Sequence, residues 1–582
     1  MQHKEYFYLA AGILLSIFTV FYYLFRGYSW NVLLLWLVSL LLAGTFFFLH
    51  RAKSKTSKDS GDSKLPDLYL ILALLLVFTP LYLYSIYNIP VQVSSDEIVI
   101  MSYEKELTAN QTPDIFGLSN YYNYPAFIFI IFGLFGKLLG GINLLNMRIV
   151  HAVSGLLIIF FCYMFFRSFT SRIFAFGAAV LVGSNHALLG ISRLALRDNS
   201  ALLVQLAALT LLFTGYKRKC PFYSFLGGVV GGLSFYNYLP GRFTMALWLL
   251  FLLLLAVRSK AKLPALAKIT AISLLGFGLV LAPLIAATIK SPQTEFDWVR
   301  TRMLIFPEGQ DLQKEWVYAP TVGEGIKINT IRGITLFNNN VYDQNNVYVN
   351  FGHGFVDPLT GVLVWVGFVL FLFKPIKKDE DYLVAGSFLM IWLILGLLFN
   401  KAPHYNSLLI ILPFVAFLTI EASKSMSGVI PKLLKSALPI SKIAFIIIIA
   451  SIFLWNMLIF ADFVKTGIAH GDDIGSTARY VEARKNIQNY SFILLANKEY
   501  PYYSWGDAYG WKARIMFFAG DQQNVKVVSP DDLTKNLEEA PLTVFMSQKL
   551  WLKINNSLTN KFPDLKIHDI KPDSSLIAIE AN

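Results

Sequence analysis

The sequence predicts an α-helical polytopic membrane protein with about 13 transmembrane helices, followed by a small α/β domain outside the membrane. Of the 582 residues, 55% are hydrophobic and only 15% are charged, too little charge for the surface of a soluble protein of this length. The apolar residues also gather in runs of roughly 20, the helix length needed to cross about 30 Å of hydrocarbon.

Short basic clusters separate the apolar runs. The runs occupy residues 6–25, 30–50, 67–87, 124–140, 149–166, 173–191, 200–215, 222–238, 243–257, 268–288, 359–373, 382–399, 405–420 and 442–463. The clusters are RAKSKTSKDSGDSK (51–64), RSFTSR (167–172), YKRK (216–219), RSKAK (258–262), KPIKK (374–378) and the segment 424–442. Because Lys and Arg concentrate in cytoplasmic loops, we expect all six clusters on the cytoplasmic side.

Three apolar runs, 67–87, 124–140 and 149–166, lie between the first two clusters, although an even number of spans must separate clusters on one side. The middle run is short, rich in glycine and interrupted by Lys137. We therefore expect it to form an interfacial or re-entrant helix on the outer side. The remaining runs then give about 13 spans, with the N-terminus inside and the C-terminus outside.

Four segments follow from this pattern. Residues 1–50 form an N-terminal transmembrane hairpin, an addition to the core that the polar stretch 51–66 tethers as a flexible cytoplasmic linker. Residues 67–463 form the transmembrane core. Residues 464–582 have a soluble composition, so we expect an extracytoplasmic α/β domain there.

Strand and helix patterns alternate in this last segment. SFILLAN, VKVVSP and PLTVFMS are typical of short buried strands, and helical patterns occur near 475–488 and 529–538.

The charge and the motifs exclude several classes of partner. The net charge is +13, but the basic residues lie between apolar runs rather than on one continuous face, which argues against nucleic acid. Only two cysteines occur, Cys162 and Cys220, in or beside predicted spans, so no disulfide framework is expected. The sequence lacks a phosphate-cradling glycine loop, a serine nucleophile elbow and Cys/His spacing for zinc. A lipid with a phosphate-linked group therefore suits it better than a soluble nucleotide sugar.

The adjacent acids Asp96 and Glu97 follow a predicted span on the outer side. Charged groups near the hydrocarbon are costly and are commonly functional. A carboxylate at this position could act as a general base on an incoming hydroxyl. The alternative is a solvated loop start that carries two acids without a function.

ISRLALRDNS places Arg193, Arg197 and Asp198 at the outer end of another predicted span. Arginine suits a phosphate because its planar fork presents paired donors. Asp198 could orient an arginine, or bind a sugar hydroxyl or a metal. A solvated helix end is the alternative.

SFYNYLPGRF adds Tyr236, Tyr238 and Arg242 on the same side. The tyrosine rings could stack on a sugar or line the path of a lipid chain, although an interfacial aromatic belt gives the same pattern.

Further cations are His353, between glycines in VNFGHGFVDPLTGVL, and Lys401 and His404 in NKAPHYN. A lone histidine is more often structural than catalytic. The sequence identifies no metal ligands, and a divalent metal stays an open alternative.

On these residues the chain resembles the GT-C-type membrane glycosyltransferases. It is most similar to their bacterial branch related to protein O-mannosyltransferases and lipid A aminoarabinose transferases. The resemblance covers residues 67–463 and is carried by the DE pair, SRLALRD, YNYLPGR and HGFVDPLTG, in this order and on one side of the membrane.

The resemblance implies an enzyme of the bacterial plasma membrane with a polyprenyl-phosphate-linked sugar as donor. The sugar would pass with inversion to a hydroxyl of a protein, lipid or glycan acceptor on the outer face. Asp96 would be the general base, and Glu97 would shape the local field or the acceptor site. Arg193, Arg197 and Arg242 would hold the leaving phosphate.

His353 would be a fourth phosphate contact, and Asp198 matches an acid common at this span end of the family. The chain also departs from the family. Aminoarabinose transferases carry an acid-Lys-Pro-Pro pattern where this chain has YYNYPA, so Asn123 and Tyr124 replace the charged pair. This weakens lipid A modification and the metal site of that subgroup.

Two alternative functions belong to other classes, and a third is a related enzyme. A transporter or flippase of lipid-linked sugars would predict intramembrane charges along a central path and internal repeats, which the sequence does not show. A scaffold that binds through its C-terminal domain would leave the acids near the bilayer unexplained. An oligosaccharyltransferase-like enzyme is suggested only by SWGDAYGW (504–511), which we attribute to chance.

Overall fold

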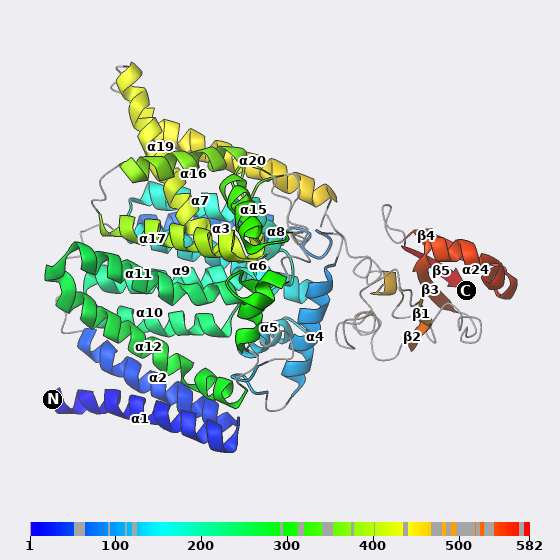
Figure 1. The fold of residues 1–582 in the computed structure, drawn as a ribbon, viewed down its shortest axis with the longest axis horizontal. Coiled ribbons are helices and arrows are strands. Elements are labelled where there is room, and N and C mark those ends of the chain that lie inside the picture. Colours follow the sequence, from blue (N-terminus) through cyan, green and yellow to red (C-terminus); the bar gives the residue numbers. More distant parts are fainter. Residues whose placement is uncertain are drawn as a thin grey trace.

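The computed structural model describes the following residues: 2–51, 65–90, 93–110, 113–118, 125–291, 295–311, 319–339, 353–373, 378–400, 402–434, 440–466, 480–482, 484, 491–495, 518, 524–528, 541–569 and 576–581. Most of them form a bundle of roughly parallel helices, and a small sheet domain lies beyond one end of the bundle (Figure 1).

Fourteen of the helices run along the bundle. They are α1 (Gln2–Arg26), α2 (Trp30–Arg51), α3 (Leu65–Leu83), α6 (Leu144–Arg167), α7 (Arg172–Ser184), α8 (His186–Ser192), α9 (Asn199–Arg218), α10 (Pro221–Leu233), α11 (Phe243–Arg258), α12 (Leu263–Lys290), α16 (Pro358–Phe373), α17 (Asp379–Leu393), α19 (Leu412–Leu434) and α20 (Ile440–Thr466). The shorter helices are α4 (Ser95–Ala109), α5 (Phe127–Leu138), α13 (Glu295–Arg302), α15 (Val322–Thr335) and α18 (Tyr405–Leu408). Of these, α4 and α5 lie at the end of the bundle that faces the sheet domain (Figure 1).

Ten helices of the described chain are long and apolar enough to cross a membrane, and the bent pair α7–α8 raises the number to eleven. The pair is bent by 59° at Asn185, whose side chain caps α8 by accepting a hydrogen bond from the Leu188 backbone N–H at 3.0 Å. Two further predicted spans coincide with the shorter helices α10 and α16. The multi-span architecture is confirmed, whereas the count of 13 stays a prediction.

Three of the basic clusters, 167–172, 216–219 and 258–262, form ion pairs at one end of the bundle, which we call the basic end. Arg167 and Arg172 both pair with Asp67, at 2.8 and 3.3 Å. Lys217 pairs with Glu380 at 2.9 Å, and Lys262 pairs with Asp379 at 3.2 Å. The sequence predicted that these loops lie on one side of the membrane, and the structure places them at the same end of the bundle. The assignment of this end to the cytoplasm remains a prediction.

The segment predicted not to cross is the helix α5. Its 12 residues extend about 18 Å, well short of the hydrocarbon thickness. It packs beside α4 and α6 at the end opposite the basic end. A side chain at Gly133 of α5 would come within 2.7 Å of Thr108 in α4, so the glycine noted in the sequence permits this close packing.

The N-terminal hairpin is integrated into the bundle, in contrast to the addition that the sequence suggested. Helices α1 and α2 pack against α12, and α2 also contacts α10. The Tyr23 hydroxyl donates to Asp114 Oδ2 at 2.6 Å, and Asp114 Oδ1 accepts from the backbone N–H groups of Phe116 and Gly117 at 3.1 and 3.0 Å. The Phe116 ring lies edge-on to Trp36 with centroids 5.2 Å apart. The hairpin therefore holds residues 113–118, which follow α4.

The C-terminal domain contains a five-stranded sheet of order β2-β1-β3-β5-β4. Its strands are β1 (Ser491–Leu495), β2 (Asn524–Val528), β3 (Leu542–Ser547), β4 (Lys566–Asp569) and β5 (Leu576–Ala581), with α24 (Gln548–Lys561) between β3 and β4. β1 is parallel to β2 and β3, and β5 is antiparallel to β3 and β4. The three predicted strands are confirmed as β1, β2 and β3, whereas the helix expected near 529–538 lies outside the described residues.

Two glycines of α12 provide a test of the helix packing. A Cβ at Gly276 would overlap the carbonyl oxygen of Phe225 in α10, whereas a Cβ at Gly278 has nothing within 4 Å. We expect Gly276→Ala to destabilise the protein by about 1–3 kcal/mol through overpacking. Gly278→Ala should leave stability unchanged or raise it by up to about 1 kcal/mol. Thermal unfolding in detergent compares the two variants, and equal midpoints would contradict the α10–α12 contact.

Candidate active site

Asp96 lies at the second position of α4, and Ser94 is the N-cap of this helix. The Ser94 hydroxyl accepts from the Asp96 backbone N–H at 3.1 Å, and Glu97 Oε2 accepts from the Ser94 N–H at 2.9 Å. These two bonds form a capping box, which fixes where the helix begins. The half-buried Asp96 carboxylate therefore stands at the positive end of the helix dipole.

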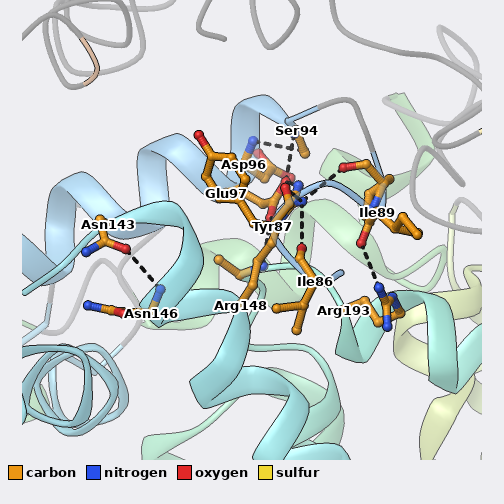
Figure 2. Close-up of polar contacts among 12 residues, drawn as sticks. Ile86, Tyr87, Ile89, Ser94, Asp96, Glu97, Asn143, Asn146, Arg148 and Arg193 are labelled. Atoms are coloured by element: carbon orange, nitrogen blue, oxygen red, sulfur yellow. Dashed lines mark hydrogen bonds and ion pairs between the residues drawn. The ribbon is translucent and has the colours of Figure 1, made fainter. Parts of the chain in front are cut away.

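Glu97 and Arg148 form a fully buried ion pair, with Nε–Oε1 at 2.8 Å and Nη2–Oε2 at 3.0 Å. Glu97 Oε1 also accepts from the Ala195 N–H at 2.9 Å. Arg148 Nη1 donates to three backbone carbonyls of residues 86–90 at 3.0–3.3 Å. Figure 2 shows this cluster next to Asp96. The pair thus joins α4, α6, the turn after α3 and the segment before α9.

These contacts change the role that the sequence suggested for Glu97. Each carboxylate oxygen already accepts one bond from Arg148 and one from a backbone N–H. Glu97 therefore has no oxygen directed at a substrate, and it acts as an anchor for the helix that presents Asp96.

Arg193 is likewise an anchor rather than a phosphate contact. Its guanidinium donates to the carbonyls of Leu81, Tyr84 and Ile89 at 2.7, 2.6 and 3.2 Å, and the residue is 1% exposed. Burial, together with the nearby charge of Arg148, lowers the pKa of Arg193 to about 10. Arg193 holds the turn after α3, and these contacts favour a positioning role over the substrate contact that the sequence predicted.

Arg197 and Asp198 lie together just before α9, as the sequence predicted. The Arg197 guanidinium stands over the rings of Phe129 and Tyr238, 5.6 and 5.4 Å from their centroids. Asp198 accepts from the Asn406 amide at 3.2 Å and interacts with the Tyr238 hydroxyl. Burial raises the pKa of Asp198, Arg197 opposes this effect, and the charge of Asp96 adds to it. Asp96, Arg197 and Asp198 thus form one electrostatic unit.

Tyr238 and His404 belong to the same network. The Tyr238 hydroxyl lies 3.1 Å from Ser407 Oγ, and Ser407 Oγ lies 2.8 Å from His404 Nδ1. His404 also caps α18, since its Nδ1 accepts from the Ser407 N–H at 3.3 Å. Lys401, predicted beside His404, lies outside the described residues.

Tyr236 and Arg242 flank this network. The Tyr236 hydroxyl donates to the Val280 carbonyl at 2.9 Å, and its ring contacts Phe116 and Phe127 at centroid distances of 6.0 and 5.4 Å. Tyr236 therefore forms a wall of the site. Arg242 is half-buried, and its guanidinium lies 5.6 Å from the centroid of the Phe235 ring.

His353 makes its described contacts elsewhere in the bundle. Its Nε2 lies 4.0 Å from Asp462 Oδ2 of α20, and its ring centroid lies 6.3 Å from that of His186 in α8. Asp357, from the same segment, caps α16 by accepting from the Thr360 N–H at 3.0 Å. The described contacts thus do not join His353 to Arg197 or Asp198.

An apolar cavity of about 420 Å³ lies next to this polar site, between α5, α6, α9 and α10. Its walls include Phe132, Phe135, Leu157 and Tyr236, and its polar residues are Ser154, Ser200 and Asn237. The Ser200 hydroxyl donates to the carbonyl oxygen of Arg197 and to the Asn237 side chain. The cavity therefore begins where the Arg197 network ends.

Two buried titratable residues near Arg197 were missed in the sequence. Glu104 of α4 and His151 of α6 are both 0% exposed, and Arg197 acts electrostatically on each. Burial raises the pKa of Glu104 well above its usual value of 4.5, against the opposing charge of Arg197. His151 and Arg148 lie at the start of an apolar run, where ionisable residues signal function, so this signal was present in the sequence.

No group of three or more His, Cys, Asp or Glu side chains with metal-site geometry occurs among the described residues.

The buried ion pair can be tested by removing one partner. Glu97→Met leaves Arg148 buried without its counter-charge, and we expect a loss of about 3–5 kcal/mol in unfolding free energy. The double variant Glu97→Met/Arg148→Met should recover most of this loss, because neither charge remains. Glu308→Gln, which breaks the exposed Arg300–Glu308 pair, should cost less than about 1 kcal/mol. Denaturant unfolding measures the unfolding free energy of each variant. A loss of less than about 1 kcal/mol in Glu97→Met would contradict the anchoring role of the Glu97–Arg148 pair.

The raised pKa of Glu104 predicts a pH dependence of stability. Between 4.5 and its higher folded-state pKa, the folded protein binds a proton that the unfolded chain has released. Stability therefore falls as pH rises through this window. Glu104→Gln cannot titrate and should flatten this part of the curve of melting temperature against pH. Parallel curves for wild type and variant would show that Glu104 does not titrate as inferred.

No family model and no curated protein matches the chain. Solved structures do match it. ArnT from Cupriavidus metallidurans in the apo state has a TM-score of 0.50 and 13% identity over 88% of this chain and 98% of its own. The archaeal oligosaccharyltransferase AglB from Archaeoglobus fulgidus, in complex with an inhibitory peptide and a dolichol-phosphate, has a TM-score of 0.51 and 14% identity over 80% of this chain and 65% of its own. The chain thus has the fold of the GT-C-type membrane glycosyltransferases.

Proposed function

We propose that this protein is a membrane glycosyltransferase that moves a sugar from a polyprenyl-phosphate-linked donor to a hydroxyl acceptor. The observation that carries the proposal is the position of Asp96. Its carboxylate is held at the N-terminus of α4 by the Ser94 capping box and the Glu97–Arg148 pair, and it lies within electrostatic reach of Asp198, the neighbour of Arg197. Asp96 thus lies near the adjacent residues Arg197 and Asp198, beside an apolar cavity.

In the proposed reaction, Asp96 acts as the general base. The Asp96 carboxylate takes the proton of the acceptor hydroxyl while the hydroxyl oxygen forms a bond to the anomeric carbon. The bond between the anomeric carbon and the phosphate oxygen breaks, and the phosphate leaves with the bonding electron pair. Attack opposite the leaving group inverts the anomeric configuration.

The leaving phosphate gains negative charge as this bond breaks, so donors aimed at it lower the barrier. We assign this role to Arg197 and Arg242, because Glu97 and backbone carbonyls occupy Arg148 and Arg193. Asp198 accepts from Asn406 and lies next to Arg197, so we assign it to orienting that arginine.

The apolar cavity supports a lipid-linked donor. Its walls are almost entirely hydrocarbon side chains, and its polar residues Ser200 and Asn237 connect to Arg197. A polyprenyl chain in this cavity would bring its phosphate to the arginine site. AglB, which shares the fold, is described in complex with a dolichol-phosphate, a lipid of the same chemistry.

The acceptor can be a protein, a lipid or a glycan, and the C-terminal domain stands at the end of the bundle where it would meet the acceptor (Figure 1). The Tyr87 hydroxyl donates to Glu482 Oε2 at 2.6 Å, which connects this domain to the turn held by Arg148. We assign this end to the extracytoplasmic side, since the basic end then faces the cytoplasm.

The proposal predicts that Asp96→Asn abolishes transfer without abolishing lipid binding. General base catalysis contributes roughly 10²–10⁴-fold to a rate, so turnover should fall by about that factor, and the isosteric amide should leave the fold intact. The measurement is sugar release from a radiolabelled polyprenyl-phosphate hexose by the purified protein in detergent, with and without a chelator.

Glu106→Gln, at an exposed position of the same helix, is the matched control and should turn over like wild type. Full activity of Asp96→Asn would place the base elsewhere. A wild-type protein that binds the lipid but releases no sugar with any acceptor would favour transport of lipid-linked sugars instead.

A further inference from the structure

Glu104 and His151 are two buried titratable side chains near Arg197 that the proposed mechanism does not use. Both are 0% exposed. Neither oxygen of the Glu104 carboxyl and neither ring nitrogen of His151 has a hydrogen-bond partner in the part of the chain that the structure describes. Four polar atoms of two neighbouring helices, α4 and α6, are therefore buried and unpaired.

Both side chains lie beneath α5, next to Arg197. The Phe132 ring of α5 lies edge-on to His151, with centroids 4.5 Å apart. The Phe129 ring, one turn earlier, lies under the Arg197 guanidinium. A Cβ at Gly133 would come within 3.1 Å of the Glu104 carbonyl oxygen and 3.3 Å of its Cβ. α5 thus covers a polar cluster that consists of Glu104, His151 and Arg197.

A cluster of buried, unpaired polar groups destabilises the folded protein, so a purely structural role does not account for it. An unpaired buried polar group costs roughly 1–3 kcal/mol, and native structures leave few of them. Leucine or phenylalanine at these positions would fill the space under α5 without that cost. The residues are therefore better explained by a polar ligand that completes their hydrogen bonds.

The chemistry of the cluster selects the class of ligand. Burial raises the pKa of Glu104 and so favours its neutral form, which has one donor and several acceptor positions, and a neutral imidazole offers one of each. A phosphate would receive few donors here and suits the guanidinium of Arg197 better. A lipid chain would leave all four atoms unpaired. A ring that carries several hydroxyls pairs with them, and the faces of Phe129 and Phe132 suit its apolar side.

We propose that Glu104 and His151 form the subsite that hydrogen-bonds the hydroxyls of the donor sugar, beside the phosphate contact at Arg197. This inference rests on the proposed function and assigns it a specificity site.

The test separates recognition of the sugar from recognition of the lipid phosphate. Full-length protein in detergent is titrated with a short-chain polyprenyl phosphate and with the same lipid carrying mannose or glucose. We expect wild type to bind at least one of the sugar-bearing lipids more tightly than the bare lipid. Glu104→Leu should bind the bare lipid like wild type and lose roughly tenfold or more of the sugar-dependent gain, about one hydrogen bond to a buried group.

Glu104→Gln keeps a neutral donor and acceptor, so it should retain most of the sugar-dependent gain. His151→Phe should behave like Glu104→Leu, and the exposed Glu106→Leu on the same helix should behave like wild type in both titrations. Glu104→Leu should also unfold at a temperature equal to or above that of wild type, because it removes an unpaired polar group.

Three results are decisive. A Glu104→Leu variant that keeps the full sugar-dependent gain overturns the inference and leaves the cluster as a packing defect. Wild type that binds the bare and the sugar-bearing lipids equally also overturns it, while the phosphate contact of the proposed function stands. Wild type that binds none of the lipids refutes the proposed function itself.

Discussion

The buried pair of Glu97 and Arg148 determines the geometry of the whole site. Charges without solvent are stable in a protein only when every donor and acceptor is satisfied, and here the two side chains use two bonds to each other and five to the backbone. Those backbone groups belong to the turn after α3, the N-cap of α4 and the segment before α9. One ion pair thus fixes the distance between Asp96, which follows the cap, and Arg197, which follows Ala195.

Neighbouring residues of the site make different contacts, and for Asp96 and Glu97 the difference follows from how deeply each side chain is buried. Asp96 and Glu97 are adjacent acids at one helix terminus, but successive helical residues point about 100° apart, so one carboxylate enters the core and the other stays half-exposed. Arg193 and Arg197 are both buried but differ in their contacts. Arg193 holds backbone carbonyls, whereas Arg197 lies over aromatic rings next to Asp198.

The sequence was sufficient for the bundle, for the failure of α5 to cross and for the strands β1 to β3, because each depends on local apolar pattern or on the charge of nearby loops. It was also sufficient to select the segments around Asp96, Arg197 and Tyr238. It could not separate anchors from substrate contacts, since Arg148 lies 51 residues from Glu97 within an apolar run. Glu104 was missed for a related reason: in the polar stretch SYEKE it resembles its solvated neighbours, and only the packing of α5 buries it.

The parts outside the core are attached to the segments that flank α4. The N-terminal hairpin holds residues 113–118, after α4, through the hydrogen bond between Tyr23 and Asp114. Within this segment, the Phe116 ring packs against the Tyr236 ring in the cavity wall. The C-terminal domain reaches the turn before α4 through Tyr87 and Glu482, and Arg148 binds the carbonyl of the same Tyr87. A rigid helix whose two flanks are anchored to different parts of the chain keeps its N-terminal carboxylate in a defined place. The helix α5 is held in the same way, since Gly133 packs closely on α4, the Ala126 N–H donates to the Gly117 carbonyl at 2.9 Å and Lys137 Nζ donates to the Thr108 carbonyl. This helix therefore covers the buried face of α4.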